Sequence, residues 1–173
     1  MKILGLMRHA KSDWNDGDTR DFDRGLNARG RKGARLMGDH IRDHGIKWDA
    51  LIASPAQRVK TTLEEALPEL TPEWDRRLYL AGTDTMMDVL HQASGKAVLI
   101  AAHNPGLGDM VLELVAPAHE NALFDEAKVK FPTASYAVFE LDIDDWADLT
   151  PECGKLVHFA RPRDLDPELG PDT

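Results

Sequence analysis

The chain has 173 residues, of which 42% are hydrophobic and 29% charged, as expected for one globular domain. Its formal net charge of −9 argues against a general nucleic-acid-binding protein, and its longest aliphatic run, residues 97–102, is far too short to span a membrane. The single cysteine excludes an internal disulfide and a cysteine metal cage. The N-terminal apolar run is too short for a signal peptide, so we expect a cytoplasmic protein.

The charge is unevenly distributed along the chain. Residues 1–35 carry nine Lys/Arg and five Asp/Glu, whereas residues 36–173 carry twelve and twenty-five. This asymmetry is explained either by a local anion site near the N-terminus or by chance clustering on solvated faces.

The first half of the chain predicts two strands, each followed by a helix. Asn27 is the expected cap of the first helix and Gly45 its end, while Ser54 as N-cap and Pro55 at the first helical position begin the second. The elements are a strand over 2–8, a polar loop over 10–26, a helix over 28–44, a strand over 49–53 and a helix over 55–67.

The second half continues the alternation of strands and helices. Residues 97–102 are apolar throughout, which is typical of a central parallel strand buried on both faces. The other elements are a weak strand near 77–80, helices over 83–90, 105–115 and 121–128, and strands over 135–141 and 155–160. We expect residues 1–162 to form a single domain and 163–173 to be a loose tail.

This order predicts an α/β fold with three layers, α/β/α, around a mostly parallel sheet. Ligands of such sheets bind at the carboxyl ends of the strands. That edge would hold Arg8 and His9 after the first strand, His103 after residues 97–102, and Arg58 early in the second helix. Two imidazoles and two guanidiniums suit a phosphoryl group, because guanidiniums match its oxygens and a neutral imidazole can attack phosphorus.

The same residues lie in ordered motifs that resemble the histidine phosphatase superfamily. The second histidine motif, His103-Asn104-Pro105, follows the others, and the ending 159–165 resembles the branch of SixA-type protein phosphohistidine phosphatases. The earlier motifs are Leu6-Met7-Arg8-His9-Ala10-Lys11-Ser12-Asp13-Trp14-Asn15, Arg24-Gly25-Leu26-Asn27-Ala28-Arg29-Gly30 and Ser54-Pro55-Ala56-Gln57-Arg58-Val59-Lys60-Thr61-Thr62.

The resemblance implies a phosphoglycerate mutase-like fold with minimal insertions and a phosphatase that forms a phosphohistidine intermediate. His9 would attack phosphorus, and Arg8, Arg58 and His103 would bind the phosphoryl oxygens and stabilise the transition state. The resemblance also implies substrate contacts from Arg24 and Asn15. It implies no metal and no cofactor, because the protein cations neutralise the phosphoryl charge.

Two positions depart from the superfamily pattern. Ala10 stands where the wider family has glycine, so the turn after His9 must accommodate a Cβ. The carboxylic acid that protonates alkoxide leaving groups in other branches has no clear counterpart, and Asp84 is the nearest candidate. An alkoxide leaves poorly without a proton donor, whereas imidazole is a better leaving group, so the pattern favours phosphohistidine as substrate.

Three functions remain open from the sequence. The first is a phosphatase acting on phosphohistidine in a protein, with an open pocket. The second is a small-molecule phosphomonoesterase with the same site, and the third is a phosphate-binding regulator without turnover. None of them requires nucleic acid or a membrane, and the sequence does not indicate an oligomeric state.

One further histidine pattern has a structural interpretation. His40 and His44 are four residues apart on the first helix, which is a spacing used by metal ligands. The Glu of the H-E-x-x-H motif is absent and the sequence shows no third ligand, so we interpret them as a solvated helix end.

Overall fold

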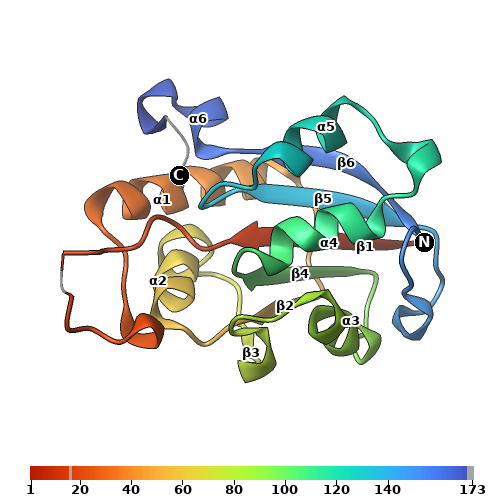
Figure 1. The fold of residues 1–173 in the computed structure, drawn as a ribbon, viewed down its shortest axis with the longest axis horizontal. Coiled ribbons are helices and arrows are strands. Elements are labelled where there is room, and N and C mark those ends of the chain that lie inside the picture. Colours follow the sequence, from red (N-terminus) through yellow and green to blue (C-terminus); the bar gives the residue numbers. More distant parts are fainter. Residues whose placement is uncertain (16, 171–173) are drawn as a thin grey trace.

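The computed structural model describes residues 1–15 and 17–170, and their strands form one six-stranded sheet (Figure 1). The strand order is β3-β2-β4-β1-β5-β6, in which β1 to β4 are mutually parallel and β5 is antiparallel to both neighbours. The predicted α/β fold with a mostly parallel sheet is therefore confirmed. The strands are β1 (Lys2–Arg8), β2 (Ala50–Ala53), β3 (Glu73–Trp74), β4 (Ala97–Ala102), β5 (Tyr136–Leu141) and β6 (Gly154–Ala160).

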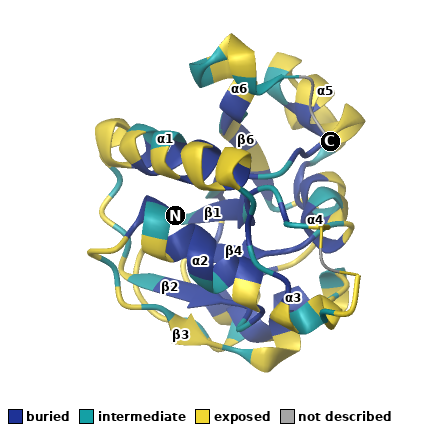
Figure 2. Ribbon diagram, turned by 90° about the vertical axis from the view of Figure 1, so that its left-hand side faces the viewer, coloured by how far each residue is buried: buried dark blue, intermediate teal, exposed yellow. Residues whose placement is uncertain are grey.

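Helices cover both faces of the sheet and enclose two apolar clusters (Figure 2). The alternation along β4 shows the division: Val98 and Ile100 pack with α3, α4 and α5, whereas Leu99 and Ala101 pack with α1 and α2. None of the described helices is long and apolar enough to span a membrane. The helices are α1 (Ala28–His44), α2 (Gln57–Ala66), α3 (Thr83–His91), α4 (Gly106–Leu114), α5 (Ala122–Val129) and α6 (Pro162–Leu165).

Both ends of α1 are formed as the sequence predicts. The Asn27 side chain accepts a hydrogen bond from the Gly30 N–H, and Gly45 adopts the left-handed conformation with φ 85°. At Gly38 a Cβ would collide with the carbonyl oxygen of Ala66, so glycine allows α1 to lie directly against the end of α2. This close approach helps to place α2 beside the edge of the sheet.

Two predicted boundaries are wrong. The third strand lies at Glu73–Trp74, and Arg76–Leu78 instead form a 3₁₀ turn, because the Asp75 side chain accepts the Arg77 N–H and ends the extended backbone. Helix α2 begins at Gln57, two residues later than predicted. Ser54 is not its N-cap, because the cap position falls on Ala56, two residues later.

The C-terminal segment is structured over the part that is described, contrary to the expectation of a loose tail. Residues 162–165 form α6 and Pro167–Leu169 a 3₁₀ turn. Arg29 of α1 donates hydrogen bonds to the carbonyls of Glu168 and Gly170, and Lys32 pairs with Asp166 at 3.1 Å. These polar contacts attach the segment to α1, while residues 171–173 lie outside the described residues.

Candidate active site

The ends of β1 and β4 bring two histidines together at one edge of the sheet. Arg8 pairs in register with Ala102, so the residues that follow each strand are neighbours. The His9 N–H donates to the Ala102 carbonyl at 3.2 Å, and the ring centroids of His9 and His103 are 5.3 Å apart. The parallel pairing of two central strands thus creates the predicted histidine pair.

The His9 ring is held in one tautomer. Its Nδ1 lies 2.8 Å from the carbonyl oxygen of Ala10, which can only accept, so Nδ1 carries the proton and Nε2 keeps a lone pair. The pKa of His9 is lowered to about 3, mainly by burial and also by the charges of Arg8 and Arg58 and by His103, although the hydrogen bond to the Ala10 carbonyl acts in the opposite direction. His9 is therefore neutral at physiological pH, as a nucleophilic imidazole must be.

His103 is oriented by Ser54, which directly follows β2, the neighbour of β4 in the sheet. Its Nε2 lies 2.7 Å from Ser54 Oγ, which also accepts the Ala56 N–H. When the Ser54 hydroxyl donates to Nε2, the proton of neutral His103 resides on Nδ1. Burial, followed by the charge of Arg58, lowers the pKa of His103 to about 4.

Thr62 links the turn after His9 to helix α2. Its hydroxyl accepts the Ala10 N–H at 2.9 Å and donates to the Arg58 carbonyl at 2.6 Å. Ala10 is not among the residues with positive φ, so this turn accommodates its Cβ without left-handed backbone. The spacing from Arg58 to Thr62 thus has a structural basis, because one hydroxyl on α2 joins the arginine's helix to the turn that carries the histidine.

Two guanidiniums, that of the buried Arg58 and that of the partly buried Arg8, lie beside the histidines. Arg8 donates from Nη1 to the Phe131 carbonyl, and its burial, with Arg58 nearby, lowers its pKa to about 10, so it stays charged at neutral pH. Arg58 donates from Nη1 to the Asp21 carbonyl at 2.8 Å and from Nη2 to Asp21 Oδ2 at 3.2 Å. The site is therefore strongly cationic at its base.

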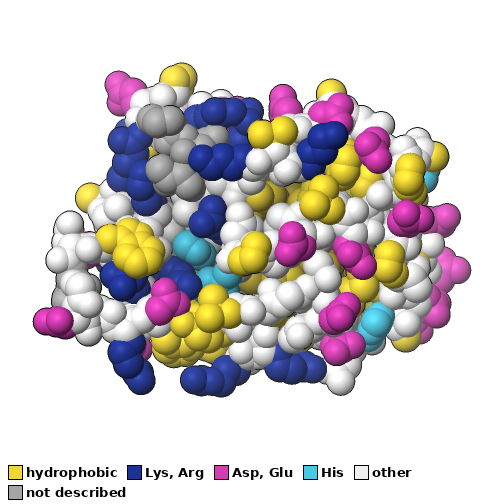
Figure 3. Space-filling model, in the orientation of Figure 1, with side chains coloured by type: hydrophobic (Ala, Val, Ile, Leu, Met, Phe, Trp, Pro, Cys, Tyr) yellow, Lys and Arg dark blue, Asp and Glu magenta, His cyan; other side chains and the backbone are white. Residues whose placement is uncertain are grey.

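These groups line a pocket of about 460 Å³ that opens to solvent. Figure 3 shows histidine side chains at the surface, bordered by Lys and Arg side chains, which agrees with the predicted open pocket. The lining includes all four predicted catalytic residues, Arg8, His9, Arg58 and His103, and also Lys11, Ser12, Trp14, Asp21, Asn104 and Thr133.

Three other residues considered from the sequence do not line this pocket. Arg24 is buried behind it, where its guanidinium lies 3.9 Å from the centroid of the Trp14 ring and donates to the Asp13 carbonyl. Asn15 is exposed on the same loop, and Asp84 is exposed on the first turn of α3. The structure therefore does not place a carboxylic acid from Asp84 at the site.

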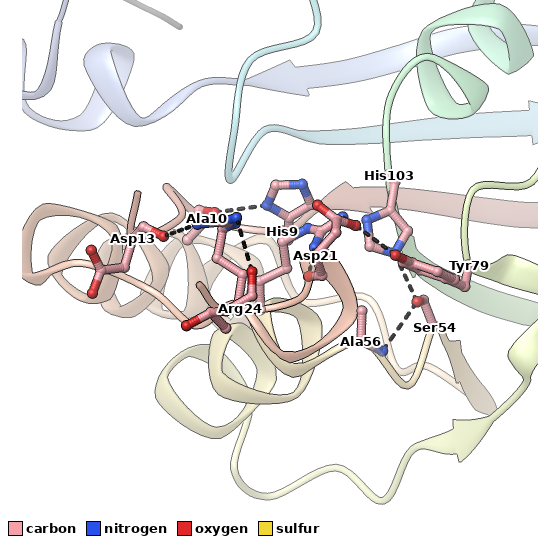
Figure 4. Close-up of polar contacts among 11 residues, drawn as sticks. His9, Ala10, Asp13, Asp21, Arg24, Ser54, Ala56, Tyr79 and His103 are labelled. Carbon is pink, nitrogen blue, oxygen red and sulfur yellow. Dashed lines mark hydrogen bonds and ion pairs between the residues drawn. The ribbon is translucent and has the colours of Figure 1, made fainter. Parts of the chain in front are cut away.

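Asp21 and Tyr79 also lie at the site, although neither was among the candidate site residues predicted from the sequence. The Tyr79 hydroxyl donates to Asp21 Oδ2 at 2.6 Å, and its ring meets the His103 ring edge-on at 5.6 Å (Figure 4). Asp21 lies in a loop with several aspartates, and no pattern distinguishes it from its neighbours. Tyr79 lies in a segment that the sequence predicts to be a strand, so nothing in the sequence indicated that its side chain lies at the site.

Metal ligands are not grouped in this structure. Within residues 1–15 and 17–170, no three His, Cys, Asp or Glu side chains are arranged to hold a metal ion.

Comparisons with known proteins point to the same superfamily. Residues 4–81 match the histidine phosphatase superfamily (branch 1). An uncharacterised protein of Mycobacterium tuberculosis is 32% identical over 160 residues, which cover 91% of this chain and 100% of the relative.

Solved structures of putative phosphohistidine phosphatases SixA share the fold. One from Nakamurella multipartitia superposes with a TM-score of 0.82 at 26% identity, covering 93% of this chain and 96% of the other. Another from Agrobacterium tumefaciens gives a TM-score of 0.74 at 25% identity, with 93% and 98% coverage. The chain therefore belongs to the histidine phosphatase superfamily, as a histidine-based phosphatase whose solved structural relatives include proteins of the SixA type.

Proposed function

We propose that this phosphatase removes the phosphoryl group from phosphohistidine in a protein, through a phosphohistidine intermediate on His9. The observation that carries the proposal is the state of His9: a neutral ring whose Nδ1 proton is held by Ala10, leaving Nε2 nucleophilic beside two guanidiniums. In-line attack of Nε2 on phosphorus would form the N–P bond to His9 and break that of a substrate ring whose other nitrogen carries a proton, so that a neutral imidazole is released. Water would then hydrolyse the phosphoenzyme to inorganic phosphate.

Arg8, Arg58 and His103 are the proposed ligands of the phosphoryl oxygens. Two of them have buried polar atoms with no hydrogen-bond partner among the described residues, namely Arg8 Nε and His103 Nδ1. A buried donor without a partner is costly, and a phosphoryl oxygen would satisfy it with a charge-assisted hydrogen bond. These contacts would strengthen as negative charge develops on the oxygens in the transition state.

Arg24 and Asn15 do not contact the phosphoryl group in this proposal. Arg24 would fix the loop that carries Trp14 at the pocket wall, because it stacks on that indole. Asn15 would contact only a part of the substrate that extends beyond the pocket, since its side chain is exposed on that loop.

Among the described residues, the pocket lining offers no protonated carboxylic acid, which favours phosphohistidine over a phosphomonoester as substrate. Asp21 is the only carboxylate that lines the pocket within the described residues, and the Tyr79 hydrogen bond, together with Arg58, holds its pKa below the usual value. An ionised Asp21 cannot protonate an alkoxide, whereas the imidazole of phosphohistidine leaves more readily. Phosphate esters are the alternative substrates to test.

The test compares phosphate release from a phosphohistidine-bearing protein and from a generic aryl phosphate. We expect faster release from phosphohistidine, no release by His9→Ala, and normal release by the matched control His119→Ala, which lies on an exposed turn. Acid-labile label retained on wild type but not on His9→Ala would support the intermediate. A preference for the aryl phosphate would favour the phosphomonoesterase, and unchanged release by His9→Ala would contradict both enzymatic functions.

A further inference from the structure

Arg58 is engaged by a residue of the chain at the position where it would meet a phosphoryl group. Both of its terminal nitrogens donate to Asp21, one to the main-chain carbonyl at 2.8 Å and one to Oδ2 at 3.2 Å. The Arg58 side chain is only 7% exposed, whereas that of Asp21 is 48% exposed. A buried cation at the base of the pocket is thus paired with an anion at its mouth.

The carboxylate is held on a second side. The Tyr79 hydroxyl donates to the same Oδ2 at 2.6 Å, and the Tyr79 ring packs edge-on against Phe22 and His103. Figure 4 shows Asp21 beside the rings of His9 and His103, with Tyr79 next to it. The hydrogen bond from Tyr79 and the charge of Arg58 lower the pKa of Asp21, which keeps the carboxylate negative at neutral pH.

We propose that the Asp21 carboxylate competes with phosphate for the Arg58 guanidinium and so weakens binding of the phosphate product. This inference rests on the proposed function, because it assumes that the phosphoryl group binds between His9 and Arg58. A phosphoryl group that reaches Arg58 has to displace the carboxylate or lie next to it, and like charges at close range repel. Asp21 is thereby an affinity-determining residue for the anion.

Such a competitor has a kinetic benefit. Guanidiniums that bind the substrate's phosphoryl group as strongly as they bind the transition state would lower KM without raising kcat. They would also release the phosphate product slowly, and slow release would limit turnover. A carboxylate that returns to Arg58 as phosphate departs lowers the cost of leaving that cation unpaired. The half-exposed position of Asp21 allows it to move toward solvent while the anion is bound.

A purely structural role for Asp21 predicts the opposite sign. If Asp21 only oriented Arg58, loss of its charge would loosen the guanidinium and weaken phosphate binding. If it competes, loss of its charge strengthens phosphate binding. The sign of the change therefore separates the two roles.

The experiment measures the Kd of inorganic phosphate by calorimetry for wild type, Asp21→Asn and the control Asp23→Asn. Asn keeps an oxygen for Arg58 and Tyr79 but loses the charge, and Asp23, on the same 3₁₀ turn, pairs with Arg20 and does not line the pocket. We expect the Kd to fall about tenfold in Asp21→Asn, as for removal of one like charge at a half-exposed site, and to stay unchanged in Asp23→Asn. Tyr79→Phe, which frees one side of the carboxylate, should lower the Kd by a smaller factor.

An unchanged or higher Kd in Asp21→Asn, with normal binding by wild type, would overturn the inference and leave the proposed function intact. Should Asp21→Asn fail to fold, an unchanged or higher Kd in Tyr79→Phe overturns it instead. Failure of both wild type and folded Asp21→Asn to bind phosphate at millimolar concentration would contradict the proposed function itself, and the inference with it.

Discussion

The protein contains two groups of histidines, and only one of them lines an open pocket beside two guanidiniums. His9 and His103 lie at the end of the parallel strands, with ring centroids 5.3 Å apart. A lateral histidine cluster, defined here as His40, His44, His158 and the adjoining Tyr136, lies where α1 crosses β5 and β6. In that cluster the His44 and His158 rings stack with centroids 4.1 Å apart, and His40 Nε2 lies 2.8 Å from His158 Nε2.

One histidine of each group, His103 and His158, has a lowered pKa for a similar main cause. The pKa of His103 and that of His158 are each lowered to about 4, in both cases mainly by burial. The secondary causes differ, because Arg58 acts on His103, whereas His44 and His40 act on His158. The guanidiniums and the open pocket therefore distinguish the candidate active site from the lateral histidine cluster.

The largest effect should come from removing the proposed nucleophile. His9→Ala should lower kcat by about a thousandfold or more, since loss of the attacking group removes the covalent route. His158→Ala should retain kcat within about twofold, because this partly buried side chain does not line the pocket. Steady-state phosphate release measures kcat for both variants. A comparable loss of kcat in the two would contradict the distinction between the two histidine groups.

The next largest effect should come from the guanidinium beside His9. Arg8→Lys should lower kcat about a hundredfold, because lysine cannot keep the hydrogen bond to Phe131 and also present a planar fork to the phosphoryl oxygens. Arg42→Lys on α1, whose side chain pairs with Asp39 and Glu69, is the matched control and should keep full activity. Equal activity of the two variants would show that the geometry of the Arg8 guanidinium is not required.

A smaller effect is expected from the residue that orients His103. Ser54→Ala removes the 2.7 Å contact with His103 Nε2 and should lower kcat about tenfold, the value of one lost hydrogen bond of ordinary strength. The thermal midpoint checks that the buried strand end remains folded. Unchanged kcat in a folded variant would show that His103 is oriented without Ser54.

The smallest effect concerns acid stability and the lateral histidine cluster. The pKa of His158 is about 4 in the folded protein, below the usual 6.5, so between these values the unfolded chain takes up a proton that the folded chain does not. The free energy of unfolding should therefore fall as pH decreases from 6.5 to 4. His158→Gln should reduce that fall by about 1 kcal/mol, given the solvent screening of a partly exposed ring.

Denaturant unfolding at pH 7 and pH 4.5 measures this difference. The exposed His119→Gln serves as control, and the active-site histidines are common to all three proteins. An identical pH dependence in wild type and His158→Gln would show that the lateral histidine cluster does not oppose protonation.

Much of the fold and the centre of the site could be predicted from local patterns. The apolar run 97–102 formed the buried central strand, and Asn27 and Gly45 bounded α1, because these signals act within a few residues. Arg8, His9, Arg58 and His103 could be grouped because the carboxyl ends of parallel strands meet at one edge. His40 and His44 were also correctly placed on one helix, but their third imidazole, His158, comes from a strand more than a hundred residues away.

Contacts between segments that are far apart in the sequence depend on the three-dimensional packing, because no sequence period connects them. The sequence predicts that Ser54 caps a helix, yet its hydroxyl contacts His103, 49 positions later. Asp21 and Tyr79 are 58 positions apart and share one short hydrogen bond beside Arg58. Hydrophobic periodicity determines which face of an element is buried, whereas polar side chains in loops find their partners only when the packed elements bring those loops together.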